Sequence, residues 1–168
     1  MYLMYYFIIL LFFLPLTVFA DSPEKCSLDM EINQDQILIN KKYKSLDFSY
    51  CELIGITLND LDLKNTNFTG SNLSGSYLHG SNFENANFNN AILYGTNFQS
   101  SNLENVDFNN AILDGSTFRD ANLENANFTD ASLKNVNLYK ANLINTDFTN
   151  ADATNTNFCG AYLAYMKF

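Results

Sequence analysis

Three glutamates, Glu84, Glu104 and Glu124, recur in the sequence at every twentieth position. If the chain returns to the same place at this interval, their carboxylates stack about 5 Å apart. Like charges at that distance in water repel by about 0.8 kcal/mol, so such a ladder could bind a cation or a basic protein. It would be a poor calcium site, because calcium takes about 6–8 oxygen ligands arranged around it. The alternative is a solvated ladder whose repulsion Lys64 partly relieves.

The sequence offers no set of side chains for catalysis, and it predicts a protein that is not an enzyme and has no cofactor or metal. Its one histidine, His79, is interpreted as a surface residue, because a lone imidazole supplies neither a multi-histidine site nor a Ser–His–acid triad. Acidic residues outnumber basic ones 18 to 9 in the 168 residues, for a net charge of −9. Direct nucleic-acid binding is therefore not expected, because nucleic-acid binders neutralise phosphates with Lys and Arg.

The three cysteines allow two interpretations. If the chain is exported, a disulfide between Cys26 and Cys51 is plausible. It would fasten the segment around Cys26 to the start of the repeating region that is described below. Cys159 could then pair with a second chain. Free thiols are the alternative for each of them.

Segment 1–20 contains no charged side chain, and Asp21 follows immediately. Small residues stand at −3 and −1 of a cleavage site after Ala20, as in a secretory signal peptide, although no Lys or Arg precedes the apolar stretch. Segment 1–20 is therefore predicted to be a signal peptide, and the protein to be periplasmic or secreted. The alternative is an uncleaved membrane anchor, since about 17–25 apolar residues span a bilayer.

The elements that position these side chains come from a repeat with a period of five. In steps of five from Phe48 to Phe168, every residue is Leu or Phe except Ala153. A small or compact residue stands two places before most of these central residues. A period of five fits neither a helix nor a strand. It fits a chain that turns after every short segment, with the small and central residues inward and the three polar residues outward or at the corner.

A second period, four times as long, lies on top of the first. Central residues 48, 68, 88 and onward to 168 are all Phe, whereas 53, 73, 93, 113 and 133 are all Leu. The outer positions repeat as well, with Gly at 55, 75, 95 and 115 and Asn at 65, 85, 105, 125 and 145. Asn is expected at these corners because it tolerates a left-handed backbone, and stacked Asn side chains can form a ladder.

Residues 46–168 resemble the pentapeptide-repeat family, whose motif A(D/N)LxN appears as Ala121-Asn122-Leu123-Glu124-Asn125. The resemblance implies an all-β fold, a right-handed quadrilateral β-helix of about six 20-residue coils and a rod roughly 30 Å long. Residues 21–45 break the period and are expected to cap the N-terminal end of the rod.

Two apolar groups are candidate contact surfaces. Ile92 and Ile112 are expected to be stacked and solvent-facing, with Tyr94 nearby, either as a contact patch or as β-branched residues that stabilise a ladder. The final coil exposes a second apolar group, formed by Tyr162, Tyr165, Met166 and Phe168. Two-fold dimerisation through this coil is one prediction, and last residues that fray or fold over the end are the alternative.

The sequence therefore favours an exported, non-enzymatic scaffold that binds a protein partner through a flat side of the rod. The alternative is a DNA-mimicking inhibitor or protector of a type II topoisomerase, a role known among pentapeptide-repeat proteins. Export speaks against that alternative, because its target is cytoplasmic. So do the basic residues that interrupt the sides, at Lys64, Arg119, Lys134 and Lys140. A membrane contact is expected only if segment 1–20 stays uncleaved.

Overall fold

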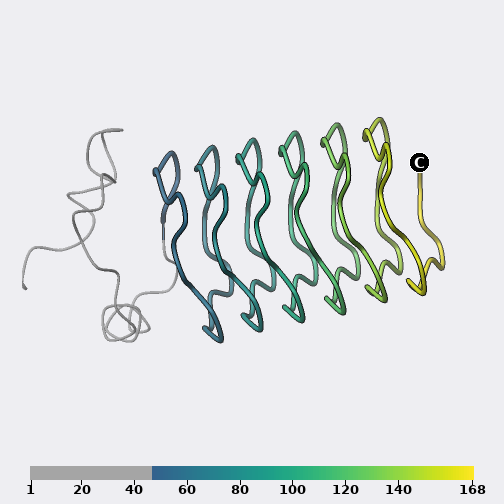
Figure 1. Ribbon diagram of the computed structural model, residues 1–168, viewed down its shortest axis with the longest axis horizontal. Coiled ribbons are helices and arrows are strands. Elements are labelled where there is room, and N and C mark those ends of the chain that lie inside the picture. The colour runs from purple at the N-terminus through teal and green to yellow at the C-terminus, as the bar shows by residue number, and fades with distance from the viewer. Residues whose placement is uncertain (1–46) are drawn as a thin grey trace, which may run out of the picture.

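The computed structural model describes residues 47–168 as a straight stack of similar coils (Figure 1). The signal segment 1–20 and the cap segment 21–45 lie outside the described residues. Within 47–168 there is no helix, and the only β-structure is a series of single-residue bridges. These parallel bridges hold the coils together, and each joins a residue to the one 20 positions later, from Asp47–Asn67 to Asp147–Lys167. The 20-residue period of the sequence is thus the repeat of the coil. No helix among the described residues is long and apolar enough to cross a membrane.

The chain turns a corner after every fifth residue. Every fifth position from Tyr50 to Tyr165 has a positive φ, between 57° and 72°. Gly and Asn occupy most of these corners, because a left-handed backbone costs other residue types about 1–2 kcal/mol. Asn65 and the four Asn residues stacked above it have φ of 57° to 60°, which confirms the predicted backbone. The short segments between corners explain why each side forms only one bridge per pair of coils.

We number the four sides of a coil in chain order. The first side carries central residues 48, 68, 88 and so on, the second 53, 73, 93, the third 58, 78, 98 and the fourth 63, 83, 103. The second and fourth sides are two corners apart, so they face away from each other. This assignment decides which outward side chains share a surface.

The interior is filled by the central residues and by the small residues two places before them. From Leu53 to Phe148 the central side chains are at most 2% exposed. The Phe rings of the first side stack directly, with centroids 4.7 Å apart between Phe68 and Phe88 and 5.0 Å apart between Phe108 and Phe128. Burial of each such ring is worth about 1.5–3 kcal/mol. The predicted inward positions are confirmed.

Several small inward residues are Ser or Thr, and their hydroxyls bond the backbone of the coil below. Ser76, Thr96 and Ser101 each donate to the carbonyl of a Leu 23 positions earlier, at 2.8–2.9 Å. Because these hydroxyls are bonded, their burial costs little. Polar residues therefore occupy the core without breaking the stack.

Candidate interaction surfaces

The three stacked glutamates lie half-buried on the fourth side, one on each of three successive coils. Lys64 is next in the same column, and its Nζ lies 2.7 Å from an Oε of Glu84. The hydrogen bond to Glu84 and the negative charge of Glu84 raise the pKa of the Lys64 ammonium, and the charge of Glu104 adds a smaller effect. Lys64 thus relieves one end of the ladder, as the solvated interpretation expected. A cation or basic partner at Glu104 and Glu124 stays a prediction.

A ladder of asparagine side chains runs beside these glutamates. Its members are Asn82, Asn102, Asn122 and Asn142. Each Nδ2 donates to the Oδ1 of the preceding member, at 3.1, 3.0 and 2.9 Å. This ladder was not predicted, although the 20-residue recurrence of Asn before Leu or Phe was a usable signal. The predicted corner column forms a shorter ladder, with bonds of 3.1 and 3.2 Å among Asn105, Asn125 and Asn145.

Ile92 and Ile112 lie on the second side, where a bridge pairs them directly. Both are half-buried, so these outward side chains reach solvent only in part. The residue before each central one packs along its neighbours in the next coils, and this contact covers part of the side chain. Tyr94 and Ile54 on the same side are more exposed, at 48% and 65%. Because the second and fourth sides are opposite, the isoleucines and the glutamates do not form one surface.

A cluster of basic and aromatic side chains on the third side was also not predicted. The guanidinium carbon of Arg119 lies 5.0 Å from the ring centroid of Tyr139, and Nζ of Lys140 lies 5.2 Å from it. Nε of Arg119 also donates to Asp120 at 3.1 Å. The signal was the 20-residue spacing of Arg119 and Tyr139, which places them in adjacent coils.

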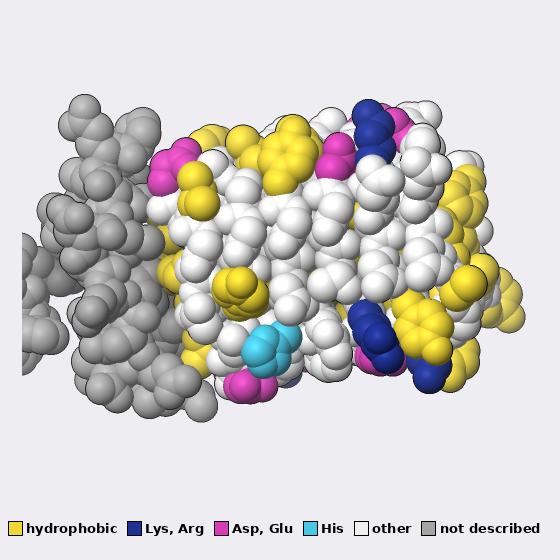
Figure 2. Space-filling view, in the orientation of Figure 1, with side chains coloured by type: hydrophobic (Ala, Val, Ile, Leu, Met, Phe, Trp, Pro, Cys, Tyr) yellow, Lys and Arg dark blue, Asp and Glu magenta, His cyan; other side chains and the backbone are white. Residues whose placement is uncertain are grey.

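The last coil exposes most of the apolar side chains that were expected there. Tyr162, Tyr165 and Phe168 are 65%, 83% and 71% exposed, and Leu163 joins them at 46%. Met166 instead packs half-buried against the core. Figure 2 shows these apolar groups together at the C-terminal end of the rod. The geometry suits a contact surface, and dimerisation through it stays a prediction.

The remaining candidate residues are the three cysteines and His79. Cys51 is buried, 3% exposed, and is disulfide-bonded. Cys26 lies outside the described residues, so the Cys26–Cys51 pairing stays a prediction. Cys159 is an exposed free thiol, and His79 is exposed on the third side. Between residues 47 and 168, no three His, Cys, Asp or Glu side chains are grouped to hold a metal ion.

Comparison with solved structures places the fold among known proteins. The chain is similar to Rfr23, a pentapeptide repeat protein from the cyanobacterium Cyanothece 51142, at 23% identity and a TM-score of 0.50, over 77% of this chain and 95% of that chain. QnrB1, a plasmid-mediated fluoroquinolone resistance protein, matches at 23% identity and a TM-score of 0.48, over 70% and 68% of the two chains. A pentapeptide repeat protein from the Arabidopsis thaliana thylakoid lumen matches at 29% identity and a TM-score of 0.36, over 61% of each chain.

The likeness to Rfr23 shows the fold alone. No curated protein matches the sequence. The family described as pentapeptide repeat region matches residues 41–118, 79–138 and 101–168. Its proteins form right-handed β-helices and are generally structural or interaction proteins. Since these matches span well over half of the sequence, the chain belongs to the pentapeptide repeat family.

Proposed function

We propose that this protein is an exported, non-enzymatic scaffold, a rod of about six coils whose flat sides bind other proteins. The observation that carries the proposal is the division between inside and outside. The inward positions repeat Leu and Phe from coil to coil. The outward positions differ from side to side and, apart from columns such as the Asn and Gly corners and the three glutamates, they also change from coil to coil. Stacking alone does not require that variety, so the outward residues are free to specify partners.

Two surfaces favour protein partners. The fourth side presents the carboxylates of Glu104 and Glu124 next to the flat Asn82–Asn142 ladder, which suits a basic protein. The last coil presents Tyr162, Tyr165 and Phe168, and large aromatic side chains are enriched at the centres of interfaces. A homodimer through the last coil is the second contact that we propose.

Two features support export. Segment 1–20 has the composition of a signal peptide. Cys51 is disulfide-bonded, and disulfides persist in oxidising compartments outside the cytosol.

Mass determination of the mature N-terminus, together with cell fractionation, tests the proposal. We expect a chain that begins at Asp21 and lies in the periplasm or the medium. A full-length chain that faces the cytoplasm would contradict export and favour the alternative, inhibition of a type II topoisomerase. Inhibition of a purified topoisomerase by the rod would then be the deciding assay.

A further inference from the structure

The second side carries an apolar patch, which we define as Ile54, Ile92, Tyr94 and Ile112. Ile54 and Tyr94 are 65% and 48% exposed. Ile92, in the coil of Tyr94, and Ile112, one coil later, are half-buried. Figure 2 shows apolar groups along the upper edge of the rod, with acidic and basic side chains on the same edge. Exposed apolar side chains that line up on one flat side indicate a contact surface.

The corner beside Tyr94 is open. A Cβ placed on Gly75, Gly95 or Gly115 would meet no atom within 4 Å. At other corners glycine makes room for this chain's own side chains, as at Gly70, where a Cβ would lie 2.7 Å from the Tyr50 ring. The glycine corners of the second side therefore add no side-chain bulk beside Tyr94.

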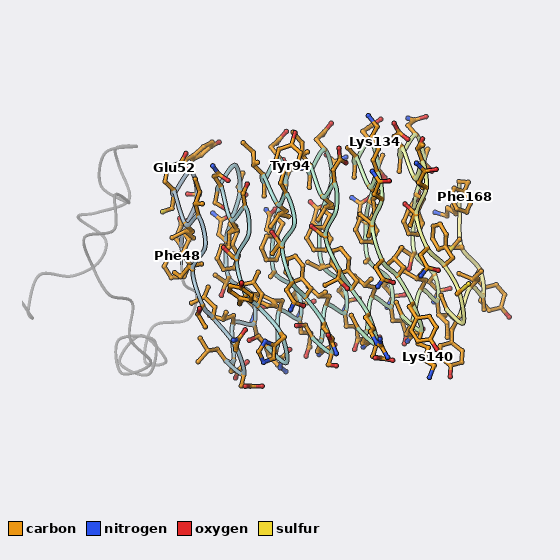
Figure 3. The ribbon with its side chains drawn as sticks, in the orientation of Figure 1. Phe48, Glu52, Tyr94, Lys134, Lys140 and Phe168 are labelled. Atoms are coloured by element: carbon orange, nitrogen blue, oxygen red, sulfur yellow. The ribbon has the colours of Figure 1, made fainter. Side chains whose placement is uncertain are left out.

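Two of the charges on the second side are placed symmetrically about Tyr94. Glu52 lies two coils before it and Lys134 two coils after it, which is about 10 Å in each direction. Figure 3 shows Glu52, Tyr94 and Lys134 in that order along one edge of the rod. The other charged residues of this side are Asp114 and Asp152. Opposite charges at equal distances from a central residue are complementary to themselves in an antiparallel self-contact.

We propose that two copies of this chain pack second side against second side, with the rods antiparallel and the two-fold axis at the coil of Ile92 and Tyr94. The axis brings Ile92 to Ile92 and Tyr94 to Tyr94 of the second copy. Lys134 of each copy then lies over Ile54 of the other, and its ammonium reaches Glu52.

The other facing positions on the second side are polar or mixed. Ser74 faces Asp114 of the second copy, and Asn72 faces Ile112. In the single chain the Ser74 hydroxyl donates to Asn72, and the Asp114 carboxylate accepts from the Ser132 hydroxyl. Asp152 lies one coil beyond Lys134. In the proposed dimer it therefore faces no described coil of the second copy. In the single chain, Nζ of Lys134 lies 3.2 Å from Asp152, and both side chains are nearly half exposed. Because an exposed ion pair contributes little, Lys134 can turn to Glu52 of the second copy at small cost.

This inference rests on the proposed interaction function and names a partner for it, a second copy of the chain. Sedimentation equilibrium of the full chain, recovered from the cell fraction in which it resides, tests it through charge reversal. We expect a dimer whose dissociation constant rises about tenfold in Glu52→Lys and in Lys134→Glu, since each change turns two symmetric attractions into repulsions. The double variant restores both pairs, and its dissociation constant should return to within about threefold of the parent value.

Two control variants separate this contact from others. Glu124→Lys changes a charge on the opposite side and should leave the association intact. Tyr165→Ser weakens the homodimer proposed through the last coil, so the charge reversals are also compared in that variant, in which the dimer through the second side should persist. Melting followed by circular dichroism confirms that every variant is folded. A monomer at all concentrations, a dimer that ignores both reversals, a double variant that stays weakened, or a dimer lost in Tyr165→Ser would overturn the inference. None of these results bears on export, which fractionation tests separately.

Discussion

Phe108 and Phe168 stand at the same position of the same side, three coils apart, and their environments differ completely. Phe108 is fully buried, and its ring stacks on Phe88 at 5.1 Å and on Phe128 at 5.0 Å. Phe168 is 71% exposed and stacks only on Phe148, at 5.5 Å. Burial in this rod is therefore supplied by the coils on both sides of a residue. The stability of each coil therefore includes its contacts with both neighbouring coils as well as its own sequence.

The backbone shows the same contrast. The N–H of Phe108 donates to the carbonyl of Asn127 at 2.7 Å. Among the described residues, no backbone carbonyl accepts from the N–H of Phe158 or Leu163 in the last coil. Unpaired strand edges and exposed apolar groups are the features through which β-structures associate. The last coil is thus suited to contact, whereas the middle coils hold the rod together.

The largest expected effect comes from removing the same ring in both places. Phe108→Ala should lower the free energy of unfolding by about 3–5 kcal/mol, because it leaves a cavity in the stack. Phe168→Ala should cost less than about 1 kcal/mol, because most of that ring is already in water. Urea unfolding of the two variants and the parent measures the difference. Phe108→Asp should disrupt the rod altogether. Equal losses at 108 and 168 would contradict the dependence on neighbouring coils.

A smaller difference is expected for buried hydroxyls. Within the described residues, the carbonyl of Leu78 accepts only from the hydroxyl of Ser101, at 2.8 Å, so Ser101→Ala leaves it unsatisfied. Loss of this hydrogen bond should lower the free energy of unfolding by about 1–3 kcal/mol.

Thr156, which is half-buried in the last coil, is the matched site. Its hydroxyl donates to the carbonyl of Leu133 at 2.6 Å, but this carbonyl also accepts from the N–H of Val136. Thr156→Val keeps the shape of the side chain and should cost less than about 1 kcal/mol. The same urea experiment compares the two variants. A greater loss at Thr156 would show that the count of bonds per carbonyl does not set the cost.

Much of this architecture could be predicted from the sequence, because the periods of 5 and 20 depend only on which positions are apolar, small or corner-forming. The Phe stack and the Asn corners followed from that pattern. The half-burial of Ile92 did not, since it depends on how side chains lie along the bridges between coils. The Asn82–Asn142 ladder and the hydroxyl bond of Ser101 depend on side-chain rotamers, which residue spacing does not determine.

The candidate surfaces were harder to predict. Each group of residues could be named from the sequence, but their joint placement depends on which corner separates them. Glu104 and Ile112 are close together in the sequence, yet they lie on opposite sides of the rod. Proximity along the chain is misleading in a solenoid, because residues one full coil apart are closer in space than residues half a coil apart.

The smallest expected effect is a difference in pH response between the two ends of the rod, the last coil with Asp147 and Asp152 and the first coils with Lys64. The Thr149 and Thr154 hydroxyls, which donate to Asp147 and Asp152, hold the pKa of both carboxyls below the usual range, and Lys167 and Lys134 add to this. A carboxyl pKa that is lowered in the folded state stabilises the fold at pH values above the unfolded pKa of about 3.9. This contribution is lost as the pH falls through the folded pKa.

The raised pKa of Lys64 acts in the opposite sense. Its contribution is present below about 10.4 and is lost as the pH rises through the folded value.

Acid should therefore loosen the coils that contain Asp147 and Asp152 before the middle of the rod, and alkali should loosen the coils joined by Lys64 and Glu84. Carboxyl chemical shifts in an NMR titration measure the first effect. The titration midpoint of Asp147 should lie below about 3.9.

Thr149→Ala removes the hydroxyl that donates to Asp147 at 2.6 Å. It should move the titration midpoint of Asp147 upward and leave the midpoint of Asp152 unchanged. If the midpoint of Asp147 did not move in Thr149→Ala, the hydroxyl would not be the cause of the low pKa. The acid response of the last coils would then have to come from Lys167, whose Nζ lies 3.2 Å from Asp147.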